Sequence, residues 1–121
     1  MRSPSDPTNL RVTKTLAGVE VHLIGCNTLN EQTSQVVKEQ LVDLIKVQGP
    51  TLLLLDLSSV DLLTSDGLGM LVALHVKLRN AGGHLTLSGV KETIYEVFEV
   101  TQLFRVLDIR REGTPGPSSA G

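Results

Sequence analysis

Apolar and polar residues alternate twice near the start of the chain. Leu10 and Val12 form the first alternating stretch, residues 19–23 form the second, and Ala17-Gly18 lies between them. Alternation over a few residues is typical of a strand with one buried face, and a short link containing glycine joins such strands into a hairpin. The pattern therefore predicts two half-buried antiparallel strands.

A helical period replaces this alternation after residue 30. Apolar residues recur at the intervals that one face of a helix requires, at Val37, Leu41, Leu44 and Ile45. Asn30 is suited to cap the start of this helix, and Gly49-Pro50 predicts its end.

A continuous apolar run follows, because residues 51–57 read TLLLLDL. Continuous rather than alternating apolar residues predict a strand at the centre of the sheet that is covered on both faces. The short length of the run, and the helix stop before it, favour a strand over a buried helix segment.

A second helix is predicted over residues 65–81, and it is apolar around more than half of its circumference. One stripe consists of Leu68, Leu71, Leu74, Leu78 and Ala81, and a second stripe beside it consists of Gly69, Val72, Ala73 and Val76. A helix with this pattern is either deeply packed or presents part of its surface to a partner.

The remaining pattern predicts a strand over 84–88, a short helix over 94–101 and a last strand over 106–109. The fold class is therefore α/β, a small mixed β-sheet with helices packed on it in the order ββαβαβα(β). Residues 9–110 are expected to form this one domain. Residues 1–8 are expected to be a flexible tail and 111–121 a disordered tail, because both have few apolar side chains.

Composition and charge exclude several classes of protein. The net charge is −2 and the aromatic residues are only Tyr95, Phe98 and Phe104, whereas modules that stack nucleobases need aromatic platforms beside basic residues. No apolar run is long enough to cross a bilayer, and the first residues lack the apolar core of a secretory signal. The single cysteine, Cys26, cannot form an intramolecular disulfide and is expected to be a partly buried apolar residue. We therefore expect a cytoplasmic protein that binds no nucleic acid and inserts into no membrane.

The arrangement of polar residues offers no machinery for catalysis. The LLLLD run is similar to the magnesium-binding strand of nucleotide hydrolases, but the phosphate-binding loop G-x-x-x-x-G-K-[ST] is missing. A receiver domain would need early carboxylates, and the first two strands offer only Glu20. His22, His75 and His84 are scattered and have no zinc-ligand spacing. We expect no enzyme, no metal and no cofactor.

The segment Thr64-Ser65-Asp66-Gly67 lies where the central strand gives way to the second helix. Thr64 or Ser65 is suited to cap that helix, and Asp66 places a negative charge at the positive end of the helix dipole. Taken alone, these four residues favour this capping role.

Several consecutive segments match a known family in their order and spacing. They are the strand end DLSS, the turn TSDGL, the apolar helix, the strand GGHLTL and the closing segment KETIYEVFEVTQLFRVLDI. Together they resemble the STAS domain of bacterial anti-sigma-factor antagonists, in which a D-S-S-G-L-type turn precedes the helix. The resemblance covers nearly all of residues 9–110.

The resemblance implies a regulatory binding module. Family members bind an anti-sigma factor that is also a serine kinase, and phosphorylation of a serine at the start of the second helix breaks the complex. Residues at matching positions are expected to contact the partner, namely Asn27, Asn30, Asp56, Ser58, Ser65, Asp66, Gly67, Leu68 and Met70. For Asp56 and Ser58 an equally good interpretation is structural, with the carboxylate at the strand end accepting N–H groups of the following loop. Weak homodimerisation and nucleotide binding stay open. The family also includes accessory or scaffold subunits of transporter, lipid-transfer and stress-sensing complexes, which is the alternative function.

The chain departs from the family at the usual phosphoacceptor. That serine directly precedes the glycine, and here the position holds Asp66, whose charge partly imitates a phosphoserine. Ser65 and Thr64 are then the candidate phosphoacceptors. In another interpretation Asp66 makes the protein constitutive, either by mimicking the released state or by resisting inactivation.

Overall fold

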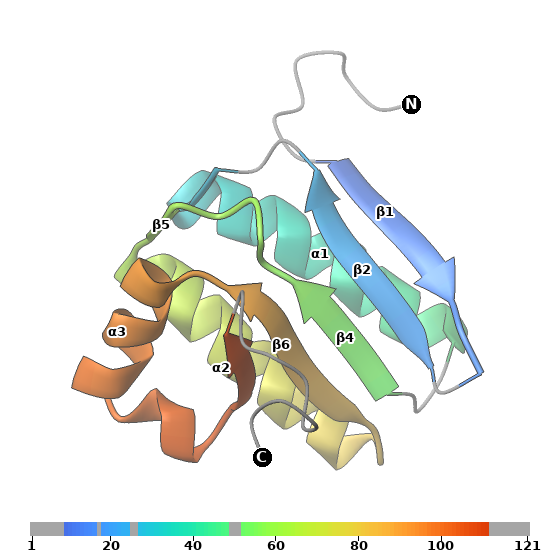
Figure 1. Ribbon diagram of the computed structural model, residues 1–121. Helices are drawn as coiled ribbons and strands as arrows, with labels where there is room; N and C mark the ends of the chain where they lie inside the picture. The colour runs from blue at the N-terminus through green and yellow to red at the C-terminus, as the bar shows by residue number, and fades with distance from the viewer. Residues whose placement is uncertain (1–8, 17, 25–26, 49–51, 112–121) are drawn as a thin grey trace.

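A five-stranded sheet carries the fold in this computed structural model, which describes residues 9–16, 18–24, 27–48 and 52–111 (Figure 1). Across the sheet the strands follow the order β1 (Asn9–Lys14), β2 (Val19–Ile24), β4 (Leu52–Asp56), β6 (His84–Val90) and β7 (Asp108–Arg111). β1 and β2 pair antiparallel, and the other neighbours pair parallel. The expected mixed sheet is therefore confirmed.

Three α-helices lie where the apolar spacing predicted them, at α1 (Glu31–Gln48), α2 (Ser65–Asn80) and α3 (Glu92–Val100). A 3-10 turn (Leu103–Arg105) joins α3 to β7. In Figure 1, α1 and α2 lie behind the sheet, and α3 lies on the side of the molecule opposite β1. Because α1 and α2 lie behind the same face, the sheet has one helix-covered face and one face that neither of them covers.

The core fills the space between the sheet and the two helices behind it. Every second residue is buried in β2 and β4, as at Val21, Leu23, Leu53 and Leu55, whereas β6 has Leu85, Thr86 and Leu87 buried in succession. Val37 and Leu41 of α1 are fully buried as the helical spacing predicted, and Phe98 of α3 is among the largest buried side chains. Each aliphatic side chain of this kind stabilises the fold by roughly 1.5–3 kcal/mol through removal of apolar surface from water.

The prediction that the central strand is covered on both faces is wrong. β4 lies at the centre of the sheet, but Leu53 and Leu55 are buried whereas Leu52 is 52% exposed and Leu54 is half-buried. A run of leucines is compatible with either one or two buried faces, so its apolar character alone does not decide between them. On the second face, Leu54 lies between Glu20 of β2 and Thr86 of β6 in the strand register.

The apolar pattern of the sequence did not predict two short strands. β3 (Thr28–Leu29) and β5 (Leu62–Leu63) pair parallel as a separate two-stranded ladder. Leu29 and Leu63 are buried, so the ladder extends the core beyond the carboxyl end of β4. It connects the segment before α1 to the segment before α2.

The domain boundaries differ slightly from those expected. Arg111 belongs to β7, one position beyond the expected limit, and its guanidinium lies 3.3 Å from Glu92 and 4.6 Å from the ring centre of Tyr95. The expected tails over 1–8 and 112–121, Cys26 and the predicted helix stop Gly49-Pro50 lie outside the described residues. None of the helices in the described ranges is long and apolar enough to cross a membrane.

Candidate functional site

Backbone hydrogen bonds hold the segments before α1 and α2 together. The carbonyl oxygen of Asn27 accepts the N–H groups of Asp61 and Leu62 at 2.7 and 3.1 Å. The carbonyl oxygen of Leu29 accepts the N–H of Thr64 at 3.0 Å. Both helices therefore start from one hydrogen-bonded ladder, which fixes their first turns relative to one another.

Thr64 is the N-cap of α2. Its hydroxyl donates to the carbonyl oxygen of Leu29 at 3.0 Å and accepts the N–H of Gly67 at 3.4 Å. The first bond fixes the helix to the β3–β5 ladder, and the second satisfies an N–H group that has no partner within the helix. Of the two predicted capping candidates, Thr64 has this role.

Gly67 allows α2 to approach the ladder closely. A Cβ atom at this position would lie 2.6 Å from Cδ1 of Leu63 and 2.7 Å from the carbonyl oxygen of Leu29. Any side chain would therefore push the first turn of α2 away from its support. Gly67 is buried, so its contribution to a partner surface is indirect.

Ser65 and Asp66 are exposed in the first turn of α2. Asp66 also borders a groove of about 240 Å³ between the first halves of α1 and α2. The other lining residues are Glu31, Ser34, Gln35, Lys38, Gly69 and Met70. Ser34 is buried, and its hydroxyl has no hydrogen-bond partner among the residues that the structure describes.

Asn30 caps α1, as the sequence predicted. Its Oδ1 accepts the N–H of Thr33 at 3.0 Å, and Oγ1 of Thr33 accepts the N–H of Asn30 at 2.9 Å. This reciprocal pair has the geometry of a capping box. The side chain of Asn30 is thus engaged within the fold, whereas Asn27 is exposed.

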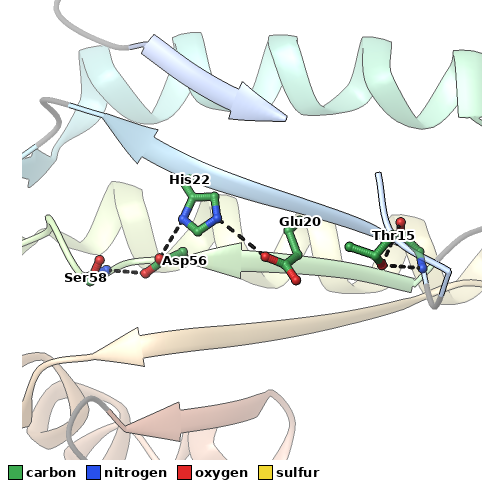
Figure 2. Close-up of polar contacts among 6 residues, drawn as sticks. Thr15, Glu20, His22, Asp56 and Ser58 are labelled. Carbon is green, nitrogen blue, oxygen red and sulfur yellow. Dashed lines mark hydrogen bonds and ion pairs between the residues drawn. The ribbon is translucent and has the colours of Figure 1, made fainter. Parts of the chain in front are cut away.

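Asp56 and Ser58 belong to a second polar cluster, at the carboxyl end of β4 (Figure 2). Oδ1 of Asp56 accepts the N–H of Ser58 at 2.8 Å, and Nδ1 of His22 donates to Oδ2 at 2.7 Å. Nε2 of His22 lies 3.5 Å from Oε1 of Glu20. The sequence does not predict the contact with His22, because only the parallel register of β2 and β4 places His22 opposite Asp56.

Hydrogen bonds lower the pKa of Asp56 in this cluster. Burial raises the pKa of Asp56, but hydrogen bonds from Ser58 and His22 outweigh burial, so the pKa lies below its ordinary value of 3.8. A nucleophilic serine requires a base that hydrogen-bonds its hydroxyl. Here His22 bonds the carboxylate instead, and the carboxylate closes the turn at Ser58.

The structure divides the predicted contact residues into three groups. Asn27, Ser65 and Asp66 are exposed around the β3–β5 ladder. Gly67 and Met70 are buried and Leu68 is half-buried against the core. Asn30, Asp56 and Ser58 are engaged in hydrogen bonds that support their own turns. The described ranges contain no group of three or more side chains arranged to hold a metal ion.

A comparison with protein families decides the assignment. The family model described as the STAS domain matches residues 12–112. The chain belongs to the STAS domain family. A relative named anti-sigma-B factor antagonist, from Listeria monocytogenes, is 30% identical over 82 residues, which cover 68% of this chain and 71% of the relative.

Solved structures share the fold of this STAS domain. An anti-sigma factor antagonist from Mycobacterium paratuberculosis has a TM-score of 0.73 at 20% identity, covering 98% of this chain and 95% of that one. The Bacillus cell fate determinant SpoIIAA in its phosphorylated form has a TM-score of 0.63 at 13% identity, covering 93% and 96%. A murine Solute Carrier 26 anion transporter has a TM-score of 0.63 at 19% identity, covering 76% of this chain and 15% of the transporter. At these identities the likeness concerns the fold alone.

Proposed function

We propose that this STAS domain is an anti-sigma-factor antagonist, a non-enzymatic module that binds an anti-sigma factor with serine kinase activity. The name of the Listeria relative supports this function. The observation that carries the proposal is the first turn of α2, where Ser65 and Asp66 are exposed on a helix start that Thr64 and Gly67 hold in place. A partner surface needs exposed side chains on a rigid support, and this turn has both.

Ser65 is the phosphoacceptor in this proposal. The hydroxyl of Thr64 already donates to Leu29 and accepts from Gly67. Both hydrogen bonds would have to break before this hydroxyl could enter the active site of a kinase. Ser65 is exposed. A phosphate in the first turn of a helix is favoured by the free N–H groups and the dipole. We therefore expect phosphorylation to leave the domain folded and to weaken the complex through charge at the interface.

Phosphorylation by the cognate kinase tests this assignment. The purified chain is incubated with the kinase and ATP, and the modified residue is located by mass spectrometry. Ser65→Ala should abolish incorporation, whereas Thr93→Ala should not. Thr93 is a matched control because it is an exposed hydroxyl residue in the first turn of α3. Unchanged incorporation in Ser65→Ala would reject Ser65 as the acceptor.

Asp66 gives the switch a second version, in which the charge is permanent. If Asp66 mimics the phosphorylated state, Asp66→Ala should bind the anti-sigma factor more tightly than the native chain in calorimetry. If Asp66 only removes the usual acceptor, Asp66→Ala should leave affinity unchanged and Asp66→Ser should become phosphorylated at residue 66. Tighter binding without new phosphorylation in Asp66→Ser would favour the permanent charge.

A second candidate function is an accessory or scaffold subunit of a transporter, lipid-transfer or stress-sensing complex. The fold likeness to part of an anion transporter favours this candidate. Affinity capture with the native chain and with Asp66→Ala separates the two functions. An anti-sigma factor that responds to residue 66 supports the antagonist, and a transporter or scaffold component that does not respond supports the alternative.

A further inference from the structure

The two edges of the five-stranded sheet differ in how well they are protected against pairing. β7 is a four-residue edge strand with two arginines, and its register with β6 is irregular between Leu87 and Val90. β1 is a six-residue strand that pairs with β2 without a register shift. Short length, charge and irregular register all discourage the pairing of an edge strand with another chain. Only the β7 edge combines all three.

An apolar groove runs beside the β1 edge, where the C-terminal half of α1 passes behind the strand. It has a volume of about 360 Å³ and is lined by Leu10, Val12, Gln40, Asp43, Leu44 and Val47. Val12 is 43% exposed and Val47 is 80% exposed. Exposed apolar side chains gathered along an edge strand are typical of a surface that another chain covers.

We propose that this chain forms a symmetric dimer in which the β1 strands of two copies pair antiparallel and each copy covers the groove of the other. An interface on a two-fold axis uses the same patch on both copies, so the patch must complement itself. Antiparallel pairing would extend the sheet across the two copies and use the backbone groups along the outer edge of β1.

The sequence of β1 favours a register centred on Val12. In that register Val12 lies opposite Val12 of the second copy, and Arg11 lies opposite Thr13, so that no like charges face each other. A register centred on Arg11 would bring two arginines together, which is unfavourable for directly opposed positions. The β1–β2 register places Leu10 and Val12 opposite Leu23 and Val21, on the helix-covered side of the sheet.

Charge complementarity supports a second copy as the occupant of the groove. In the same register, Lys14 of the second copy lies opposite Leu10, on the side of the sheet that bears the groove. Leu10 and Asp43 line this groove together, so the long side chain of Lys14 reaches the carboxylate of Asp43. The side chains of Lys14 and Asp43 make no hydrogen bond or ion pair within the described ranges, so both charges are available for this contact. The two-fold axis generates this ion pair twice.

The dimer is independent of the function proposed above. β1 is at one edge of the sheet, and the first turn of α2 lies beside the β3–β5 ladder, beyond the carboxyl end of β4 (Figure 1). Each copy can therefore keep its Ser65 and Asp66 accessible. The pairing of one edge strand buries a small area, so we expect a dissociation constant on the order of 100 µM.

Sedimentation equilibrium of the full chain, up to about 1 mM, tests the dimer. The native chain should associate, and Val47→Glu should weaken association by at least about tenfold. Val47 is mostly exposed, so this variant should fold normally. Val100→Glu is the matched control, because Val100 is 84% exposed in the last turn of α3, and it should leave association unchanged.

A charge reversal tests the register. Lys14→Asp and Asp43→Lys should each weaken association by about threefold, and the double variant should restore it. Lys46→Glu, on α1 outside the groove, should have a smaller effect. A chain that stays monomeric at the highest concentration overturns the proposal. So does a dimer that Val47→Glu leaves intact. A full-length monomer that dimerises only after removal of residues 1–8 overturns it as well, because the chain's own first segment would then occupy the groove.

Discussion

Nδ1 of His22 on β2 donates a hydrogen bond of 2.7 Å to Oδ2 of Asp56 on β4, although the two residues are 34 positions apart. The parallel register of the two strands places them directly opposite each other. This contact joins neighbouring strands on the face of the sheet that neither α1 nor α2 covers. It also leaves the other carboxylate oxygen of Asp56 to support the turn at Ser58.

Two replacements of Asp56 should distinguish the contribution of its contact with His22 from that of its contact with Ser58. Asp56→Asn keeps an acceptor for the N–H of Ser58 but loses the charge beside His22, and should cost about 1 kcal/mol of unfolding free energy at pH 7. Asp56→Ala loses both contacts and should cost about 2 kcal/mol. Urea denaturation measures both values, and Glu96→Gln on the exposed side of α3 is the control. Equal costs for the two variants would contradict a supporting role at Ser58.

The same carboxylate predicts a loss of stability in acid. The pKa of Asp56 in the folded chain is lower than its ordinary value of 3.8, because the hydrogen bonds from Ser58 and His22 outweigh burial. The stabilisation is therefore fully present above pH 3.8 and is lost as the pH falls through the folded pKa. When the pH is lowered below about 4, the unfolding free energy of the native chain should decrease more than that of Asp56→Asn. The difference between the two decreases should be about 1 kcal/mol. Parallel acid titrations followed by circular dichroism measure this difference.

Two glycines in the first half of α2 should respond to alanine with opposite signs. A Cβ at Gly67 would lie 2.6 Å from Leu63 and 2.7 Å from Leu29, whereas a Cβ at Gly69 would meet nothing within 4 Å. Gly67→Ala should therefore destabilise the fold by about 1–3 kcal/mol. Gly69→Ala should stabilise it by about 0.5–1 kcal/mol, because alanine loses less conformational entropy in a helix. Thermal denaturation compares them, and a shift of the same sign in both would contradict the close approach at Gly67.

The sequence predicted the helices and main strands because each has a periodic apolar face. The helix cap at Asn30 was predictable because its partner, Thr33, is only three residues away. The β3–β5 ladder was not, because each strand has two residues and therefore no period. The candidate site has the same limit, since the hydrogen bond that engages the hydroxyl of Thr64 depends on Leu29, which is distant along the chain.

Loss of the Thr64 hydroxyl should destabilise the start of α2. Thr64→Ala removes the cap to Gly67 and the bond to Leu29, which should cost about 1–2 kcal/mol. Thr64→Ser keeps a hydroxyl and should recover most of this loss, while Ser65→Ala should change stability by less than about 0.5 kcal/mol. Urea denaturation gives the three values. A larger loss of unfolding free energy in Ser65→Ala than in Thr64→Ala would show that Thr64 is not the N-cap.

His75 should make the domain sensitive to mild acid. It lies buried on α2, and its Nδ1 atom has no hydrogen-bond partner in the described part of the chain. Burial lowers the pKa of His75 below its ordinary value of 6.5, and the nearby charges of Arg79 and His84 lower it further. The unfolded chain therefore takes up a proton at a higher pH than the folded chain. The stability is fully present above pH 6.5 and declines as the pH falls towards the lower folded pKa.

Replacement of the imidazole by an apolar side chain should remove this decline. His75→Leu fills a similar volume without a polar atom to satisfy, so it should raise the unfolding free energy in mild acid by about 1 kcal/mol. Urea denaturation at pH 7.5 and at about pH 5.5 should give a smaller difference for His75→Leu than for the native chain. His22→Gln is the control for a histidine outside the helix-covered core, and it should keep the decline that His75 causes. An equal loss of stability in His75→Leu and in the native chain would show that the acid sensitivity has another source.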